Sequence, residues 1–231
     1  LMVSQFGPRK NFQSAIAWWV EEFIDQDVGL IIKTNTASNS IMDFQRTEDV
    51  LKNILSKYSD RKCKIYLLHG DLSSGQMTWL YNHENIKALV NIAHGEGFGL
   101  PLFEAAREAL PIITIPFGGQ VDFLYWKGEA LFQQVDFTMG LVQAEAVWPG
   151  VIEKEAMWAY ADQGSYKMTL RRTMKKWQQA KETASKLQKL INENFNNENL
   201  YAGFIESIEE FLSQDETDWL NEIEDIVKEY E

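Results

Sequence analysis

Residues 86–115 read IKALVNIAHGEGFGLPLFEAAREALPIITI. The apolar run at 86–92 predicts a strand, and the loop after it contains three glycines. Pro101 then begins an apolar, alanine-rich segment that predicts a helix, and a second apolar run at 111–115 predicts another strand. This order of strand, glycine-rich loop, helix and strand is typical of parallel α/β proteins, in which backbone amides at the start of the helix can bind an anion.

Outside this stretch, apolar runs alternate with segments of helical periodicity. The runs predict strands at 1–6, 28–33, 63–68 and 130–135. The helical spacing predicts helices at 12–24, with Asn11 as N-cap, at 43–58, at 73–81 with Ser73 as N-cap, and a short one at 121–126. Because strands that alternate with helices form βαβ units, we predict an α/β fold with a Rossmann-like, doubly wound parallel sheet.

The second half of the chain is less regular at first and then helical. Glycines and Pro149 interrupt residues 136–164, for which we predict only loop and short pieces. From Ser165 onward the spacing predicts helices, with a break at 194–197 and a further helix at 217–230. We therefore expect a Rossmann-like domain at 1–178 and, at 179–231, C-terminal helices packed against the sheet.

Composition excludes several classes of protein. The 231 residues are 45% hydrophobic, which indicates a folded protein, and no apolar run is long enough to cross a membrane. The net charge of -12 argues against binding to nucleic acid or to an anionic membrane surface. A single cysteine, Cys63, cannot form an internal disulfide, which favours a reducing, cytoplasmic location. Because the chain begins with leucine, we expect it to be a piece of a longer protein.

Two carboxylates stand around the predicted anion site. Glu96 lies in the glycine-rich loop, and Glu104 lies one turn into the helix, where its side chain leans back toward the loop. A carboxylate at either position could accept hydroxyl groups of a sugar. An acidic residue in the first turn often only stabilises the helix dipole, and glycine-rich turns are common, so this spacing leaves the functional interpretation open.

Other motifs point to no metal or dinucleotide site. Asp25-Gln26-Asp27 matches a metal-binding pattern but falls in a turn between a helix and a strand. The loop glycines do not complete a dinucleotide fingerprint, because Leu102 stands where the last glycine would be. The three histidines are scattered along the chain; His94 is equally compatible with lining the site and with a solvated loop.

The sequence EGFGLPLFEA, followed by an apolar run and GGQVDFL, resembles the signature of retaining GT-B glycosyltransferases of the family 4 type (group 1 glycosyl transferases). Within it, Glu96 and Glu104 fit the family's pair of glutamates with seven residues between them. Three further segments resemble parts of the C-terminal, donor-binding domain of this fold in the same order: PRKN at 8–11, LLHGDLSSGQMTWLY at 67–81 and MWAYADQGSYKMTLRRTM at 157–174. The resemblance covers nearly the whole chain.

The resemblance implies a role for each matching residue. Glu104 would bind the ribose hydroxyls of a nucleoside-diphosphate sugar, and Glu96 would contact the transferred sugar as the catalytic carboxylate. Lys10, assisted by Arg9, would neutralise the diphosphate, so that neither a metal nor another cofactor is expected. Backbone groups complete the expected donor-binding set: Gly97, Phe98, Gly99 and Leu100 near the sugar and diphosphate, and Thr34, His69 and Gly70 near the base.

One position departs from the family, since Gln5 stands where an arginine is usual. The expected partners are the nucleotide-sugar donor and, through an N-terminal domain that this chain lacks, a sugar, glycan or lipid acceptor. We expect the chain to bind nucleotide but, alone, to be inactive in transfer, with neither nucleic acid nor membrane as a partner. A degenerate binding or assembly module and a nucleotide-sugar epimerase on the same fold are the alternatives.

Overall fold

The computed structural model describes residues 1–209 and 218–219. The chain divides into two compact units, 1–188 and 189–231, and the boundary falls within helix α7 (Trp177–Asn194). The helix expected at 217–230 lies almost entirely outside the described residues.

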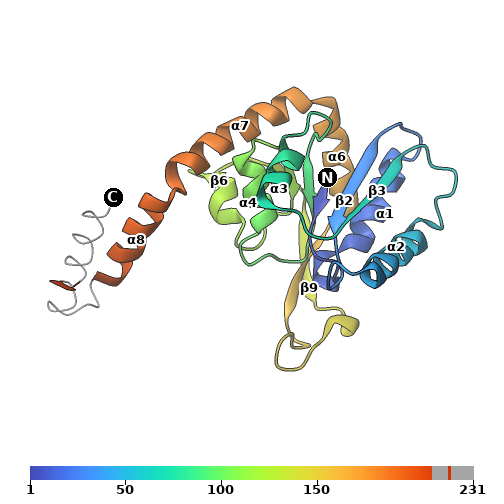
Figure 1. The fold of residues 1–231 in the computed structure, drawn as a ribbon, viewed down its shortest axis with the longest axis horizontal. Helices are drawn as coiled ribbons and strands as arrows, with labels where there is room; N and C mark the ends of the chain where they lie inside the picture. The colour runs from blue at the N-terminus through green and yellow to red at the C-terminus, as the bar shows by residue number, and fades with distance from the viewer. Residues whose placement is uncertain (210–217, 220–231) are drawn as a thin grey trace. The chain divides into compact units, whose positions relative to one another are not determined.

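The first unit is built on a parallel sheet (Figure 1). Leu1 joins its two halves, because its backbone nitrogen donates to Ala88 O at 2.9 Å and its oxygen accepts from Val90 N at 2.9 Å. The spatial order is therefore β3-β2-β1-β4-β5-β8, which is the doubly wound arrangement that the sequence predicts. The strands are β1 (Met2–Val3), β2 (Gly29–Thr34), β3 (Lys64–His69), β4 (Leu89–Asn91), β5 (Ile112–Thr114) and β8 (Gln133–Gln134).

Helices cover the sheet on both faces. Helix α1 contacts α2 and α6, whereas α3 contacts α4, and these two groups flank the strands (Figure 1). Ala105 and Ala106 of α4 are fully buried, which lets this helix pack closely against β4 and β5. The helices of this unit are α1 (Phe12–Phe23), α2 (Ile41–Leu55), α3 (Ser74–Asn82), α4 (Leu100–Arg107), α5 (Val121–Leu124) and α6 (Gln163–Lys175), with 3₁₀ turns η1 (Pro8–Lys10) and η2 (Ala144–Ala146).

The basic side of α6 pairs with α1. Lys167 contacts Glu21 at 2.5 Å, and Arg171 makes a two-pronged pair with Glu22 at 2.6 and 2.8 Å. Two of the four basic side chains of α6 are therefore paired within the protein.

The helix caps agree with the sequence in one case and differ in another. Ser73 caps α3 through a reciprocal capping box with Gln76, as predicted. Asn11 was expected to cap α1, but its backbone is left-handed and its side chain instead donates to Ile92 O at 3.2 Å. Asn11 thus stands at the predicted N-cap position, but its side chain links the turn before α1 to the end of β4 instead of capping the helix. Helix α2 begins two residues before the predicted start, because Ser40 caps it.

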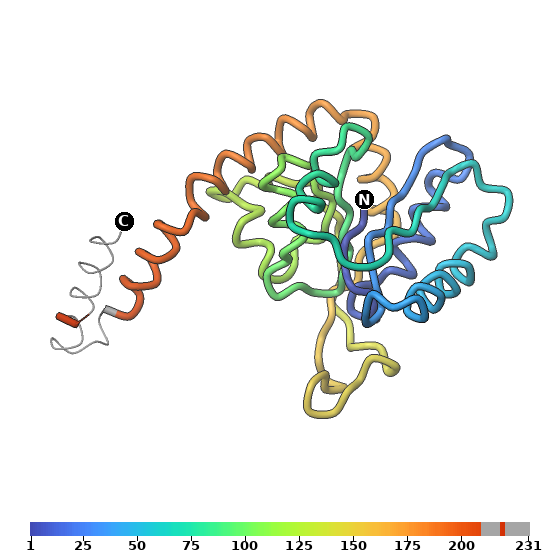
Figure 2. The backbone as a smooth tube through the Cα atoms, in the orientation of Figure 1, coloured from blue at the N-terminus to red at the C-terminus, as the bar shows by residue number. Residues whose placement is uncertain are grey.

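Two hairpins lie where the sequence predicts other structure. The predicted strand at 130–135 is divided between β8 and a small hairpin of β6 (Tyr125–Trp126) and β7 (Glu129–Ala130). Residues 136–164, expected to be loop, contain the antiparallel pair β9 (Phe137–Leu141) and β10 (Met157–Ala161). Figure 2 shows this β9–β10 hairpin, in yellow, projecting away from the sheet. Its base joins the main core through Ala159 and Ala161, whereas its outer part has a small core of its own, formed by Val142, Ala146 and Trp158.

The second unit contains the end of α7 and helix α8 (Asn197–Glu209). Asn196 caps α8, since its Oδ1 accepts from Asn199 N at 2.9 Å, and this confirms the predicted break at 194–197. Within the described ranges, none of the helices combines the length and the apolar character that crossing a membrane requires.

Candidate functional site

The candidate site lies at the carboxyl end of the parallel sheet, where the loop after β4 leads into α4. Gly99 has a φ of +83° and forms the N-cap, and the helix begins at Leu100 with a proline in its first turn. The positive φ explains the glycine, because residues with a side chain rarely adopt this conformation. In the first turn of α4, Pro101 has no amide hydrogen and Leu102 N donates to Gly99 O at 2.8 Å, so the Leu100 amide is the one left to face a ligand at the start of the helix.

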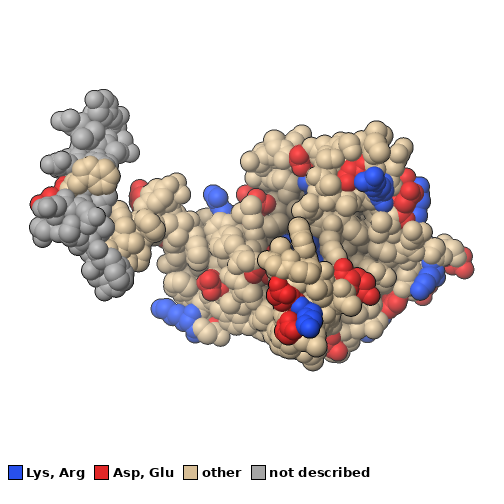
Figure 3. Space-filling model, turned by 90° about the horizontal axis from the view of Figure 1, so that it is seen from below, with Lys and Arg blue, Asp and Glu red and all other residues tan. Residues whose placement is uncertain are grey.

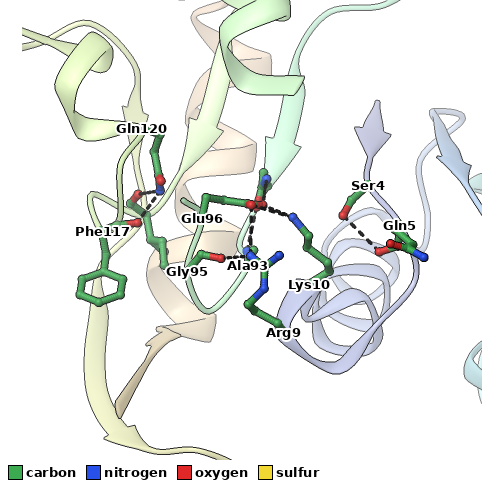
Figure 4. Close-up of polar contacts among 11 residues, drawn as sticks. Ser4, Gln5, Arg9, Lys10, Ala93, Gly95, Glu96, Phe117 and Gln120 are labelled. Atoms are coloured by element: carbon green, nitrogen blue, oxygen red, sulfur yellow. Dashed lines mark hydrogen bonds and ion pairs between the residues drawn. The ribbon is translucent and has the colours of Figure 1, made fainter. Parts of the chain in front are cut away.

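Glu96 lies at the centre of a cluster of polar groups from three parts of the chain (Figure 4). Its side chain is only 7% exposed. Lys10 Nζ approaches both carboxylate oxygens at 2.6 Å, Arg9 contacts Oε2 at 3.2 Å, and Asn91 Nδ2 donates to Oε1 at 3.0 Å. The Arg9 guanidinium also donates to Gly95 O. The structure therefore brings the predicted residues Arg9, Lys10 and Glu96 into direct contact.

The charge state of Glu96 follows from these contacts. Burial alone would raise the pKa of Glu96, but hydrogen bonds from Lys10 and Asn91 and the charges of Lys10 and Arg9 hold the pKa below its ordinary value. The carboxylate is thus ionised at neutral pH, with its oxygens already engaged by donors. A bound anion would compete with Glu96 for the two cations.

A glycine turn after β5 fixes the backbone of this loop. Gly119 N donates to Glu96 O at 2.9 Å, and a Cβ built on Gly119 would lie only 1.7 Å from Gly97 O. Gly118 has a φ of +105°, and a Cβ built on it would lie 2.6 Å from Glu96 O. Buried Gln120 holds the turn by donating to the backbone oxygens of Ile115 and Phe117. The Gly118-Gly119 turn therefore positions the glycine-rich loop.

Glu104 lies on a different wall of the site. Its Oε2 accepts a hydrogen bond at 2.8 Å from the hydroxyl of Tyr81, which is buried at the end of α3. Burial, together with the neighbouring Glu104 charge, raises the pKa of Tyr81 well above its ordinary value, so the phenol stays protonated and donates. Glu104 is half-buried and is held by α3, whereas Glu96 is held by η1 and β4.

The residues expected near a base form a third group, at the ends of β2 and β3. Thr34 and His69 are direct neighbours in the sheet register, and Gly70, with a φ of +92°, donates to Thr34 O at 3.3 Å. The His69 ring is engaged, because its Nε2 lies 2.9 Å from Asp43 Oδ2. This group can therefore offer mainly backbone atoms to a ligand.

The remaining predicted residues lie on the rim of the loop. Gly97, Phe98 and Leu100 are exposed. The Phe98 ring packs against Phe103 and Phe123, with centroids 5.2 Å away in each case, which fixes the backbone at this point.

Sequence reasoning missed three polar residues that organise the site: Asn91, Tyr81 and Asp43. Asn91 is the last residue of β4, and a polar residue at the carboxyl end of a buried strand was the available signal. Asp43 accepts from the backbone nitrogens of Thr36 and Ala37 as well as contacting His69, and so shapes the loop after β2. Burial would raise its pKa, but these hydrogen bonds hold the pKa of Asp43 below its ordinary value.

A cavity of about 790 Å³ lies elsewhere, at the amino-terminal ends of β2 and β4. Aromatic side chains such as Trp19, Tyr66 and Trp79 line it, and it contains none of the predicted site residues. Asp27, from the motif that the sequence suggested and set aside, precedes β2 and pairs with Lys64 at 3.3 Å. Nowhere in the described part of the chain do three or more histidine, cysteine or acidic side chains gather as a metal site would need.

Comparisons with known proteins place this geometry in context. No protein-family model and no curated protein sequence matches the chain. Among solved structures, Anabaena HepE in complex with UDP and glucose is similar with a TM-score of 0.59 and 13% identity, over 90% of this chain and 47% of that one. Sucrose-phosphate synthase from Thermosynechococcus elongatus is similar with a TM-score of 0.59 and 15% identity, over 89% of this chain and 44% of that one.

The third structure is shorter. It is the C-terminal domain of a glycosyl transferase group 1 family protein from Francisella tularensis, with a TM-score of 0.52 and 14% identity over 85% of both chains. The chain thus spans less than half the length of the first two structures and most of the length of this isolated domain. At such identities the likeness establishes the fold: the chain has the Rossmann-like α/β architecture of the GT-B glycosyltransferase domains that it resembles.

Proposed function

We propose that this chain is the donor-binding domain of a retaining GT-B glycosyltransferase of the family 4 type. It would bind a nucleoside-diphosphate sugar for transfer to an acceptor held by a further, N-terminal domain. The observation that carries the proposal is the cluster in which Lys10 and Arg9 meet Glu96 beside the first turn of α4. Two cations beside a helix N-terminus suit a diphosphate, and a carboxylate next to them suits a sugar hydroxyl.

Donor binding would exchange one set of ionic contacts for another. Without ligand, Lys10 is held 2.6 Å from both oxygens of Glu96. A diphosphate between η1 and α4 would draw the ammonium and guanidinium groups toward its own oxygens, so Glu96 would be released to accept a hydroxyl of the transferred sugar. As the glycosidic bond breaks, the same cations would stabilise the charge on the departing diphosphate, which is the main source of rate acceleration in such a step.

Glu104 would bind the ribose. Tyr81 donates to one of its oxygens at 2.8 Å, which fixes the carboxylate and leaves the second oxygen for a ribose hydroxyl. HepE in complex with UDP-glucose has the same fold with a TM-score of 0.59, which supports a nucleotide-sugar as ligand. We further propose that Lys10, Arg9 and the N-terminus of α4 supply all the countercharge, so that no divalent metal is required. Nucleotide affinity unchanged by EDTA would agree with this.

Calorimetric titration with UDP, GDP, ADP and dTDP, each with and without its sugar, tests the proposal. We expect one of the bases to bind with a Kd on the order of micromolar, about -8 kcal/mol. Glu104→Gln should weaken this binding by roughly 10- to 100-fold, since a hydrogen bond to a charged group contributes about 1.5–3 kcal/mol.

Glu108→Gln is the matched control, because Glu108 lies one turn after Glu104, at the C-cap of α4, and also accepts a hydrogen bond from α3, from Asn82. This variant should bind as the wild type does. Failure of every nucleotide to bind below about 1 mM would overturn the proposal.

One observation favours a second candidate, a degenerate module that binds donor without catalysis. Gln5 replaces the arginine usual in the family, its side chain points away from Glu96, and its Nε2 donates to Thr36 O at 2.9 Å (Figure 4). Transfer assays on the longer protein, with Glu96→Ala as control, separate the two. Transfer by the wild type that disappears in the variant supports an enzyme, whereas donor binding without transfer by either supports the module.

A further inference from the structure

A second cavity, of about 350 Å³, lies beside the donor site. One wall is the turn from β1 into α1, and the other is the β9–β10 hairpin with its connecting loop. The volume falls at the lower end of the roughly 300–1,000 Å³ typical of small-molecule sites. Its lining includes Gln5, Arg9 and Lys10 from the turn and Glu145, Trp148 and Trp158 from the hairpin.

The hairpin wall presents an aromatic surface on a braced support. Trp148 is 65% exposed, and its backbone is fixed by reciprocal hydrogen bonds with Ile152 at 2.9 and 2.7 Å. Trp158 is buried, and His94 stacks on it with ring centroids 5.0 Å apart. His94 Nδ1 in turn lies 2.8 Å from Ala159 O. The aromatic wall is therefore held in place without a ligand, which reduces the entropic cost of binding one.

The polar groups of the cavity carry little net positive charge. Arg9 and Lys10 are both paired with Glu96, and Glu145 adds an exposed carboxylate on the opposite wall. Gln5 contributes a neutral amide at the position where the family that the sequence resembles usually has an arginine. In Figure 3, which shows the side from which the hairpin projects, acidic and basic side chains are interspersed rather than gathered in a patch of one sign. With the charges of Arg9 and Lys10 engaged by Glu96, or by the diphosphate of a bound donor, the polar groups left to the cavity are Glu145 and Gln5, which suit a neutral ligand better than an anionic one.

We propose that this cavity is a binding site for a neutral saccharide. The exposed indole of Trp148 would stack on a sugar ring, and Glu145, Gln5 and Arg9 would exchange hydrogen bonds with its hydroxyls. Because Arg9 and Lys10 line both this cavity and the Glu96 cluster, a saccharide held here would lie next to the donor sugar. The role of this saccharide as acceptor rests on the proposed function, whereas the binding of a saccharide in the cavity does not.

Fluorine NMR of the whole chain labelled with 5-fluorotryptophan tests the site, since the chain has eight tryptophans that report on separate places. The probes are methyl glucoside, N-acetylglucosamine and maltose at millimolar concentration, with methyl glucuronide as the charged analogue. Loss of one resonance in Trp148→Phe assigns that residue. We expect the neutral probes to shift the Trp148 and Trp158 resonances, and the glucuronide to bind more weakly.

Trp148→Ala should lower saccharide affinity at least about tenfold and leave nucleotide affinity unchanged. Trp79→Ala is the matched control, because Trp79 is 64% exposed but lines the cavity at the opposite end of the sheet. Glu145→Gln, which keeps the indole and the loop intact, should lower affinity severalfold.

The possible outcomes separate this proposal from the previous one. Saccharide shifts at Trp148 without nucleotide binding support the site and refute the donor-domain function. Three results would overturn the site. The first is nucleotide binding without any saccharide shift. The others are shifts confined to Trp79 and Trp177, which line the cavity of about 790 Å³, and tighter binding of the glucuronide than of the neutral probes.

Discussion

Substituting Gly119 by alanine should damage both the stability of the domain and its affinity for nucleotide. The added Cβ would lie 1.7 Å from Gly97 O and 3.4 Å from Phe98 Cα. Since the first of these contacts involves backbone, no side-chain rotation can relieve it. The two loops must separate by roughly 1.3 Å to reach a tolerable contact.

The expected magnitude follows from this separation. Overpacking of this kind costs about 1–3 kcal/mol, and loss of the hydrogen bond from Gly119 N to Glu96 O adds about 1 kcal/mol. A displacement of about 1 Å in a positioning loop can cost on the order of 100-fold in function. We therefore expect the free energy of unfolding to fall by about 2–4 kcal/mol and nucleotide affinity to fall by at least about tenfold.

Urea unfolding measures the first quantity and calorimetry the second. Gly75→Ala is the control, because no atom lies within 4 Å of its added Cβ and the residue is in the first turn of α3. That variant should be as stable as the wild type or slightly more so. If Gly119→Ala unfolds within about 0.5 kcal/mol of the wild type and binds nucleotide equally well, the glycine turn does not position the loop.

Two further variants test the carboxylates. Because the folded pKa of Glu96 is lowered, its ionisation stabilises the fold fully above the ordinary pKa of 4.5, and this stability is lost as the pH falls through the lowered folded value. In Glu96→Gln, the free energy of unfolding measured in urea should no longer show this decrease at acid pH. An acid dependence identical to that of the wild type would contradict the assigned ion pair. Tyr81→Phe removes the hydrogen bond to Glu104, so it should cost about 1 kcal/mol of stability and weaken nucleotide binding in calorimetry, whereas unaltered affinity would remove Tyr81 from the site.

The sheet could be predicted from sequence because burial on both faces leaves a strong local signal. Strands such as β2 and β5 are nearly continuous apolar runs, as is typical of a parallel sheet that is covered by helices on both faces. The β9–β10 hairpin has no such signal, because β9 contains Gly140 and is mostly exposed. The hairpin is held by pairing between its strands, by a small core of its own and by two alanines of β10 in the main core.

The candidate site could be predicted only in part. The loop glycines and Glu96 are local features, and the resemblance supplied Arg9 and Lys10, which the structure places in contact with Glu96. The direct ion pair itself depends on segments 86 residues apart, which no local pattern reports. Asn11 shows the converse, since a good capping residue serves instead to join a turn to a strand.

His94 connects the two proposed sites in one mechanical unit. Its backbone oxygen accepts from Ala159 N at 3.0 Å, its ring nitrogen lies 2.8 Å from Ala159 O, and its backbone nitrogen donates to Arg9 O at 2.8 Å. His94, at the start of the glycine-rich loop, is thus hydrogen-bonded to both the hairpin and the η1 turn. We therefore expect a ligand that holds the hairpin also to restrict Arg9 and Glu96, in which case thermodynamic reciprocity would require the same coupling in the reverse direction.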